Sequence, residues 1–222
     1  MSELIIYGAG PFAKLMHFYF TNDSPNRVSA FTVDAPYFNE PVLCGLPVVP
    51  FEEILHRYPP SHFEMFVAVG YRRMRQRMAL YGKAKASGYR LTNYVSSQAF
   101  HFRDLQMGEN NIMLANVHVE PFTQIGDNNA FMADTLVSHD VRIGNGNFFS
   151  AKCLIASGCA IDDNCFFGNG TVLIDRLSIG SETQIVAGSV LLQNTKKCRK
   201  YMGFPAREIA SHEEHGIVIE RG

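Results

Sequence analysis

The sequence has no long apolar run and no excess of one charge. No apolar stretch approaches the roughly 20 residues that span a bilayer, and the start of the chain lacks the basic region of a signal peptide. Twenty basic and 21 acidic residues give a formal net charge of -1, which supplies no overall attraction to nucleic acid or anionic membranes. We therefore expect a cytoplasmic protein with neither nucleic-acid nor membrane partners.

Paired cysteine motifs are also missing. The five cysteines, Cys44, Cys153, Cys159, Cys165 and Cys198, are odd in number and form no CxxC pair, so the sequence predicts neither a complete disulfide framework nor a zinc knuckle. With 222 residues, 46% of them hydrophobic, the chain can bury a core in one large domain or two small ones.

The first part of the chain alternates strand and helix signals. We expect strands at residues 4–8, 28–34 and 64–70, and helices at 11–20, 51–58 and 72–87. Such alternation is typical of a parallel sheet with helices on its faces. The sequence predicts a small Rossmann-like α/β unit, and we divide the chain into residues 1–98 and 99–222.

Beyond residue 100, apolar residues recur every six positions without an insertion. At a 46% apolar background, fifteen successive hits arise by chance roughly once in 100,000, so the pattern indicates a repeat architecture. The series is Met107, Met113, Val119, Ile125, Phe131, Val137, Ile143, Phe149, Ile155, Ile161, Phe167, Leu173, Ile179, Ile185 and Leu191.

Residues three hexads apart resemble one another. Ile125, Ile143, Ile161 and Ile179 form one column, and Phe131, Phe149 and Phe167 form another. Coils of 18 residues explain these columns, and about five coils would make a triangular prism with like side chains stacked roughly 4.8 Å apart. Gly126, Gly144 and Gly180 follow the isoleucine column and suit a corner with positive φ.

The fifth position of each hexad carries a small or modest side chain. Cys153, Cys159 and Cys165 fall there, and we interpret them as compact buried filling rather than as nucleophiles or metal ligands.

Two motifs carry a resemblance to known enzymes. Val137-Ser138-His139-Asp140-Val141-Arg142-Ile143-Gly144 and Gly203-Phe204-Pro205-Ala206-Arg207 resemble those of hexapeptide-repeat acyltransferases. More narrowly, with Ile6-Tyr7-Gly8-Ala9-Gly10, the chain resembles the sialic-acid O-acetyltransferase and bacillosamine N-acetyltransferase group. The resemblance implies a left-handed parallel β-helix, an acetyl-CoA co-substrate, no metal, and a homotrimer with active sites between subunits.

The resemblance also implies roles for individual residues. His139 would be the general base, and Asp140 would hold its other ring nitrogen. The nucleotide sugar would bind at Gly8, Gly10, Asp34, Gly70, Tyr71 and Arg72. CoA would bind at Ser157, Asn169, Gly170, Ala187, Gly188, Gly203 and Pro205.

The expected function is therefore acyl transfer, most simply acetyl transfer, to an amino or hydroxyl group of a nucleotide-linked sugar in bacterial surface-glycan synthesis. Direct attack within a ternary complex would use His139 as base. Many relatives carry a second histidine where this chain has Phe148, which leaves the acyl group open.

Other interpretations remain open at this stage. A catalytically inactive binding or scaffold protein is one, and a zinc-dependent carbonic anhydrase on the same prism is another, although the repeat region holds only His118 and His139. Gly8 and Gly10 also allow a dinucleotide site, but Ala13 stands where the third glycine of that motif is expected. The arginines at positions 72, 73, 75 and 77 would either bind a pyrophosphate or form a solvated helix face.

Overall fold

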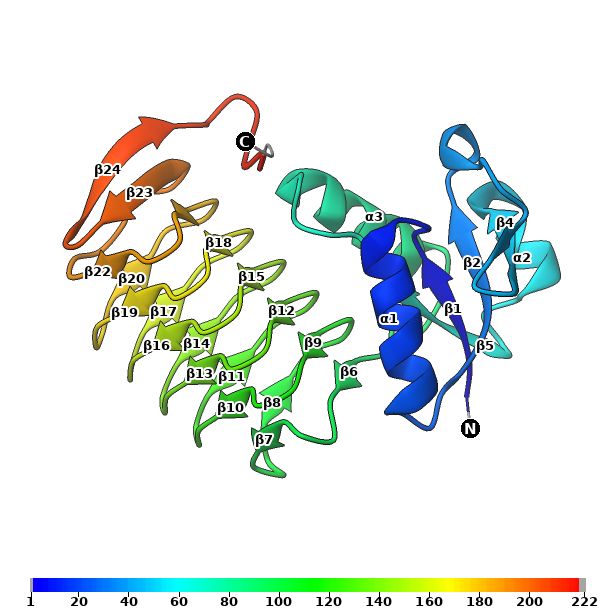
Figure 1. The fold of residues 1–222 in the computed structure, drawn as a ribbon, viewed down its shortest axis with the longest axis horizontal. Coiled ribbons are helices and arrows are strands. Elements are labelled where there is room, and N and C mark those ends of the chain that lie inside the picture. Colours follow the sequence, from blue (N-terminus) through cyan, green and yellow to red (C-terminus); the bar gives the residue numbers. More distant parts are fainter. Residues whose placement is uncertain (1, 220–222) are drawn as a thin grey trace. The chain divides into compact units, whose positions relative to one another are not determined.

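The computed structural model describes residues 2–219, which form two compact units. The first unit holds residues up to 70 together with 79–94, and the second holds residues 71–78 together with the chain from 95 onward. The predicted boundary after residue 98 stays a prediction, and residues 1 and 220–222 of the two expected domains lie outside the described residues. Each unit is described by itself below (Figure 1).

The first unit is built on a five-stranded sheet in the order β3-β4-β2-β1-β5. Strands β1, β2, β4 and β5 run parallel, and β3 pairs antiparallel with β4. The elements are β1 (Glu3–Tyr7), α1 (Pro11–Asn22), β2 (Arg27–Val33), a 3₁₀ helix (Ala35–Tyr37), β3 (Val42–Leu43), β4 (Leu46–Pro50), α2 (Phe51–Arg57) and β5 (Phe63–Val67). Helix α3 (Met74–Ala86) begins in the second unit and ends in the first.

Helix α1 shows why these residues fold locally as they do. Pro11 occupies its first turn, where the missing N–H costs nothing. Ala13, Met16 and Phe20 lie on one helix face and are buried, and the Phe20 ring packs edge-on against Phe66 at 5.0 Å between centroids. The helix thus buries one apolar stripe in the core of the unit.

The three expected strands and three expected helices of the first part are confirmed, with ends shifted by up to three residues. The β3–β4 hairpin escaped sequence analysis because Pro41, Pro47 and Pro50 surround and interrupt it. Its turn is formed by Cys44 and Gly45, both with positive φ, which is the geometry of a tight two-residue hairpin.

The second unit contains a prism of stacked two-residue strands, and the apolar residue of every hexad is the second residue of its strand. The first face contains β7 (Phe100–His101), β10 (His118–Val119), β13 (Leu136–Val137), β16 (Leu154–Ile155), β19 (Val172–Leu173) and β22 (Val190–Leu191). The second face contains β8 (Gln106–Met107), β11 (Gln124–Ile125), β14 (Arg142–Ile143), β17 (Ala160–Ile161) and β20 (Ser178–Ile179).

The third face contains β6 (Tyr94–Val95), β9 (Ile112–Met113), β12 (Ala130–Phe131), β15 (Phe148–Phe149), β18 (Phe166–Phe167) and β21 (Gln184–Ile185). An antiparallel hairpin of β23 (Arg199–Gly203) and β24 (Ala206–Ser211) extends this face, with β23 parallel to β21. All strand pairs between successive coils are parallel and 18 residues apart, for example Val119 with Val137. The 18-residue period expected from the sequence is confirmed.

Like side chains stack inside the prism. The rings of Phe131, Phe149 and Phe167 lie nearly parallel, with centroids 4.8 and 4.4 Å apart. Cys153, Cys159 and Cys165 are at most 1% exposed, and burial raises the pKa of the Cys153 thiol to about 12. A thiol so held is inert, which supports the interpretation of these cysteines as buried filling.

The corner glycines are needed for a different reason from the one expected. Positive φ falls two residues later than predicted, at positions such as Asn128, Gly146 and Asn164. At Gly126 the constraint is space, because a Cβ would lie 2.6 Å from the carbonyl oxygen of Gly144 in the next coil. Close stacking of coils, rather than backbone conformation, therefore selects glycine in this column.

We predict that Gly168→Ala destabilises the prism by between about 2 and 3 kcal/mol. Its Cβ would lie 2.7 Å from the Cα of Ala187 and 2.9 Å from the carbonyl carbon of Val186, and backbone atoms cannot move aside without displacing a coil. Urea unfolding measures the change. The matched control is Gly170→Ala, which has a φ of 67° and open space around the new Cβ, so only the backbone cost of about 1 kcal/mol is expected. Equal losses in the two variants would contradict the steric explanation.

Candidate functional site

His139 lies where the first face of the prism turns into the second. We call this edge the His139 corner; it consists of residues 102–105, 120–123, 138–141, 156–159 and 174–177, which stack coil upon coil. The side chain of His139 is 54% exposed, so the imidazole points outward, as its hexad position predicted. The carbonyl of His139 accepts a hydrogen bond from the Gly158 N–H of the next coil, which fixes its backbone.

Asp140 holds one nitrogen of the His139 ring. Nδ1 lies 2.7 Å from Asp140 Oδ2, and Asp140 itself has a φ of 59°. Because a carboxylate only accepts, this contact places the proton on Nδ1 and leaves Nε2 as the ring's proton acceptor. The pair therefore has the arrangement that general-base chemistry requires.

Glu120 is a contributor that sequence analysis missed. Its Oε2 accepts a hydrogen bond of 3.0 Å from the backbone N–H of His139, one coil further along. The signal for it was present, because residues 18 or 19 positions apart lie side by side once the coil period is known.

The expected CoA residues occupy two different corners of the prism. Ser157 lies in the His139 corner, one coil after His139, where its N–H donates to Asp175. Asn169, Gly170, Ala187 and Gly188 stack at the corner between the third and first faces. Gly203 and Pro205 form the β23–β24 turn, and the Gly203 N–H donates to Ser189 beside that corner. The structure brings all but Ser157 to one side of the prism.

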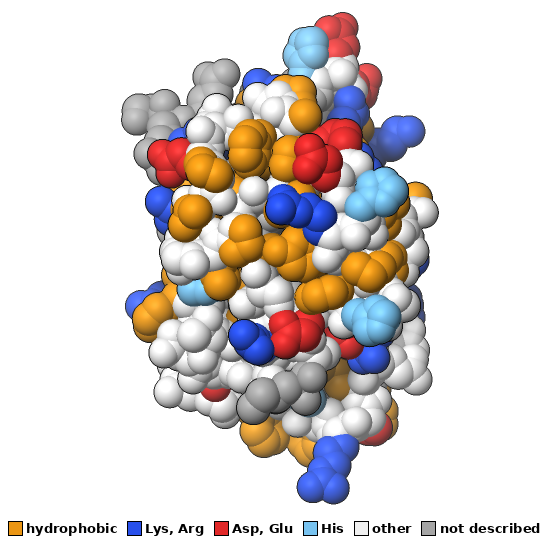
Figure 2. All heavy atoms as spheres, turned by 90° about the vertical axis from the view of Figure 1, so that its right-hand side faces the viewer, with side chains coloured by type: hydrophobic (Ala, Val, Ile, Leu, Met, Phe, Trp, Pro, Cys, Tyr) orange, Lys and Arg blue, Asp and Glu red, His pale blue; other side chains and the backbone are white. Residues whose placement is uncertain are grey.

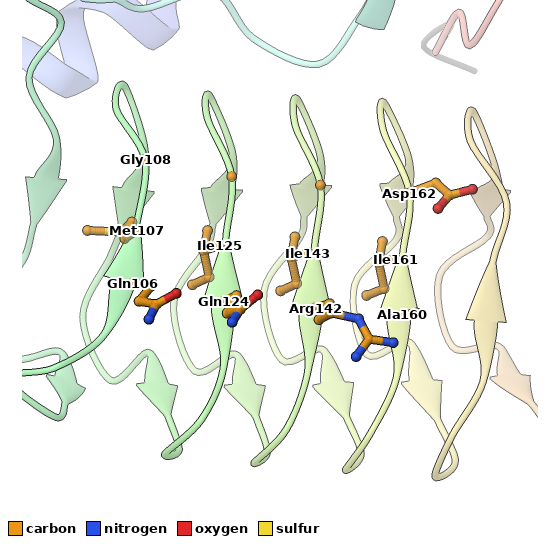
Figure 3. Close-up of a pocket in the computed structure, with 12 residues that line it drawn as sticks. Gln106, Met107, Gly108, Gln124, Ile125, Arg142, Ile143, Ala160, Ile161 and Asp162 are labelled. Atoms are coloured by element: carbon orange, nitrogen blue, oxygen red, sulfur yellow. The ribbon is translucent and has the colours of Figure 1, made fainter.

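A shallow hollow of about 660 Å³ runs along the second face, across β8, β11, β14 and β17 (Figure 3). Gln106, Gln124 and Arg142 occupy equivalent positions on three successive strands and line this hollow. Arg142 and Asp162 are its charged lining residues, and none of the expected CoA residues lines it.

In the first unit, Gly8 and Gly10 differ in what demands glycine. Gly8 has a φ of 138°, and a Cβ there would lie 2.7 Å from the carbonyl oxygen of Ala68, so packing alone explains it. Gly10 precedes α1 with an ordinary φ, and a Cβ would meet nothing within 4 Å. Neither φ nor packing requires glycine at position 10, which leaves close approach of a ligand as its physical use.

Asp34 ends β2 and is held by two side chains. The Tyr7 hydroxyl donates to Asp34 Oδ1, and Lys83 Nζ lies 2.6 Å from the same oxygen. Partial burial acts to raise the pKa of Asp34, but the hydrogen bonds from Lys83 and Tyr7 and the Lys83 charge outweigh it, so its pKa is lower than usual. Burial, followed by the bond to Asp34, raises the pKa of Tyr7 and keeps the hydroxyl protonated. Sequence analysis found Asp34 and missed Tyr7 and Lys83.

The other expected sugar-binding residues are divided between the units. Gly70 follows β5 in the first unit, while Tyr71 and Arg72 belong to the second. The Tyr71 ring packs on Phe148 and Phe166 of the third face, with centroids 4.7 and 5.2 Å apart. Phe148, which stands where many relatives have a second histidine, is 2% exposed and takes part in this packing.

Two of the four neighbouring arginines have structural partners. Arg75 forms two bonds of 2.7 Å to Glu182 and donates to the carbonyls of Glu213 and Glu214. Arg77 is 1% exposed and donates to the Gly146 carbonyl at 3.0 Å, and burial lowers its pKa. Arg72 and Arg73 are exposed. The structure thus favours neither of the two expected interpretations for the whole run.

Within residues 2–219, no helix combines the length and apolar character that crossing a bilayer requires. The same residues contain no group of three or more His, Cys, Asp or Glu side chains placed to hold a metal ion. Figure 2 shows charged side chains of both signs among apolar ones on the face that it presents, consistent with the net charge of -1.

The fold is shared with solved sugar N-acetyltransferases. A variant of GDP-perosamine N-acetyltransferase from Caulobacter crescentus, in complex with CoA and GDP-perosamine, matches with a TM-score of 0.82 and 24% identity over 95% of this chain and 98% of that one. The acetyltransferase domain of PglB from Neisseria gonorrhoeae FA1090 matches with 0.81 and 21% over 94% and 100%. WeeI from Acinetobacter baumannii AYE matches with 0.60 and 18% over 94% and 100%.

No family model and no curated protein matches the sequence. At identities below 25% the structural likeness establishes the fold, and it covers nearly the whole of each chain. The resemblance to hexapeptide-repeat sugar acyltransferases is therefore confirmed at the level of the fold.

We predict that Asp34→Asn lowers the thermal unfolding midpoint at pH 7, and that its gap from the native protein closes as the pH falls below about 4. The pKa of Asp34 is depressed by folding, so its stabilising contribution is present above the unfolded pKa and is lost as the pH falls through the folded one. Lys83→Met should reproduce the effect. Glu40→Gln, an exposed acid without a hydrogen bond or ion pair among the described residues, serves as control. A gap that stays constant down to pH 3 would contradict the assignment.

Proposed function

We propose that this chain is an acyl-CoA-dependent transferase, using acetyl-CoA, that acylates an amino or hydroxyl group of a nucleotide-linked sugar in bacterial surface-glycan synthesis. The observation that carries the proposal is the His139–Asp140 pair, exposed at a corner of a fold shared with sugar N-acetyltransferases. Solved neighbours of this fold are complexes with CoA and GDP-perosamine, and with acetyl coenzyme A.

In the proposed reaction the acceptor nitrogen or oxygen attacks the thioester carbonyl within a ternary complex. The new bond to the acyl carbon forms as the carbon–sulfur bond breaks. His139 Nε2 takes the proton of the attacking group and passes it to the CoA sulfur, so CoA leaves as the thiol. Asp140 stabilises the imidazolium formed in between, and a backbone N–H polarises the thioester carbonyl.

The division of the expected CoA residues between two corners supports a homotrimer with composite sites. A single extended CoA would contact His139 and Ser157 of one prism and Asn169, Gly170, Ala187 and Gly188 of its neighbour. Gly203 and Pro205 would flank the same groove. We further propose that the prism is left-handed with about five coils, and that the protein acts in the cytoplasm.

The first unit is proposed to be Rossmann-like and to bind the nucleotide of the sugar. Gly10, free of steric demand, would allow a phosphate to approach the start of α1. Asp34 would accept hydrogen bonds from the nucleoside, and Gly8, Gly70, Tyr71 and Arg72 complete the expected set.

We predict that His139→Ala lowers turnover by about 100- to 10,000-fold, because it removes the proton acceptor. Thiol release from acetyl-CoA, measured with a panel of nucleotide-linked sugars, reports the rate. Acetyl-CoA binding by calorimetry should change little, and His118→Ala, at the other histidine of the repeat region, should retain activity. Near-native turnover of His139→Ala would sink the assignment. A native protein that binds acetyl-CoA no better than an unrelated protein would favour the scaffold alternative.

A second prediction concerns the composite site. We expect His139→Ala and Ala187→Trp to be inactive separately, and co-expression of the two to restore about a quarter of the native activity, because that fraction of interfaces in random trimers joins two intact halves. Sedimentation of the native protein should give three times the 24.8 kDa chain mass. Absence of any restoration in co-expressed trimers would place both halves of the site in one chain.

A further inference from the structure

Phe122 is a bulky apolar residue in a backbone conformation that disfavours it. Its φ is 65°, and its side chain is 76% exposed. The equivalent position in the next three coils carries Asp140, Gly158 and Arg176, and Phe122 is the one aromatic among the described residues with positive φ. Left-handed backbone suits glycine, asparagine and aspartate, so a phenylalanine ring held in water there gains nothing for the fold. Strain of this kind points to a use for the side chain.

A hollow of about 210 Å³ lies beside this ring. Phe102, Asp104, Glu120, Pro121 and Phe122 are among its lining residues, all from the His139 corner in the two coils that precede His139. Phe102 is 44% exposed, so two aromatic rings face solvent at the rim. The hollow is separate from the long depression on the second face, although both include Gln106 and Gln124.

The hollow adjoins the general-base pair. Glu120, which lines it, accepts the hydrogen bond from the His139 N–H, and the Pro121 carbonyl accepts one of 3.2 Å from the Asp140 N–H. Coils stack at the spacing of neighbouring strands, roughly 4.8 Å, so Phe122 lies one strand spacing from Asp140. A molecule in the hollow would reach His139 from the side opposite Ser157, the expected CoA contact.

The charge of the hollow is negative. Asp104 and Glu120 are the charged residues among the described residues that line it. Asp104 forms no hydrogen bond or ion pair within residues 2–219. A primary amine is protonated near neutral pH, and both a carboxylate and an aromatic face attract such a cation. A hydroxyl offers no charge for the same groups to recognise.

We propose that this hollow is the subsite for the reacting end of an amino-sugar acceptor, with the sugar ring stacked on Phe122 and the ammonium group attracted by Asp104 and Glu120. The inference rests on the proposed function and narrows its substrate class from amino or hydroxyl acceptors to amino sugars. The bound ammonium releases one proton to solvent, and the neutral amine then attacks the thioester with transfer of its next proton through His139 to the sulfur.

Phe122→Asn separates this role from folding. Asparagine suits the left-handed backbone, so the variant should unfold at a temperature equal to or above that of the native protein. Its KM for the acceptor should nevertheless rise at least tenfold, with the KM for acetyl-CoA unchanged. Lys152→Asn is the matched control: Lys152 has a φ of 63° and lies at a different corner, so both KM values should stay native.

The choice of amine is tested with pairs of GDP-, UDP- and dTDP-linked sugars that differ only in an amino or hydroxyl group at the acylated carbon. GDP-perosamine is the amino member of one pair. The native protein should acylate an amino member at least 100-fold more efficiently than its hydroxyl partner. Asp104→Asn and Glu120→Gln should reduce that ratio at least fivefold, since the amides keep the shape and the hydrogen-bond acceptor but remove the charge.

The outcomes separate the two proposals. If the native protein acylates no probe and does not bind acetyl-CoA, the proposed function fails and this inference with it. If it acylates amino and hydroxyl members equally, or if Phe122→Asn keeps the native acceptor KM, the function stands and the subsite is wrong. Loss of trimer mass in Phe122→Asn without a change in acceptor KM would assign the ring to contact with a second copy and overturn the subsite.

Discussion

The hydrogen bonding between coils of the prism is the constraint on which the candidate site depends. Each two-residue strand pairs in parallel with the strands 18 residues before and after it, for example β13 with β10 and β16. Because a coil has no stabilising partner except its neighbours, one inserted residue would displace every side chain beyond it. The same register that stacks Phe131 on Phe149 also sets Glu120 beside His139. The packing of the interior and the geometry of the outer corner are therefore two consequences of one period.

This constraint explains how a corner can carry chemistry. Turn residues usually belong to mobile loops, yet His139 is fixed by a backbone bond on each side, to Glu120 in the preceding coil and Gly158 in the following one. The side chain remains in solvent while its backbone is tied to the prism. A pre-positioned base costs little reorganisation when substrates arrive, which is what general-base catalysis needs.

Much of this arrangement was predictable, and the limits have physical causes. The hexads revealed all fifteen strands from β8 to β22, since an inward apolar residue is required at every strand and the period never breaks. The motif around His139 indicated the outward imidazole. By contrast, Arg75 and Arg77 read as a solvated or phosphate-binding run, because nothing local shows that Glu182 and the Gly146 carbonyl, more than 65 residues away, accept their hydrogen bonds. Lys83 was missed for the same reason: its partner Asp34 lies 49 residues earlier.

Phe148 shows how one substitution can exchange chemistry for packing. The resemblance places a second histidine at this position, and here a phenylalanine is stacked beside Phe166 and covered by Tyr71. An imidazole in that environment would lose its hydration without gaining a partner, since the surrounding groups are aromatic rings. The aromatic cluster also fixes residue 71, where the chain leaves Gly70, to the third face of the prism. A protein that had given up the second histidine would need its remaining polar contacts beside His139 itself, and there the described residues place Glu120 and Asp140. The chemistry that the third face lacks is thus concentrated at a single corner.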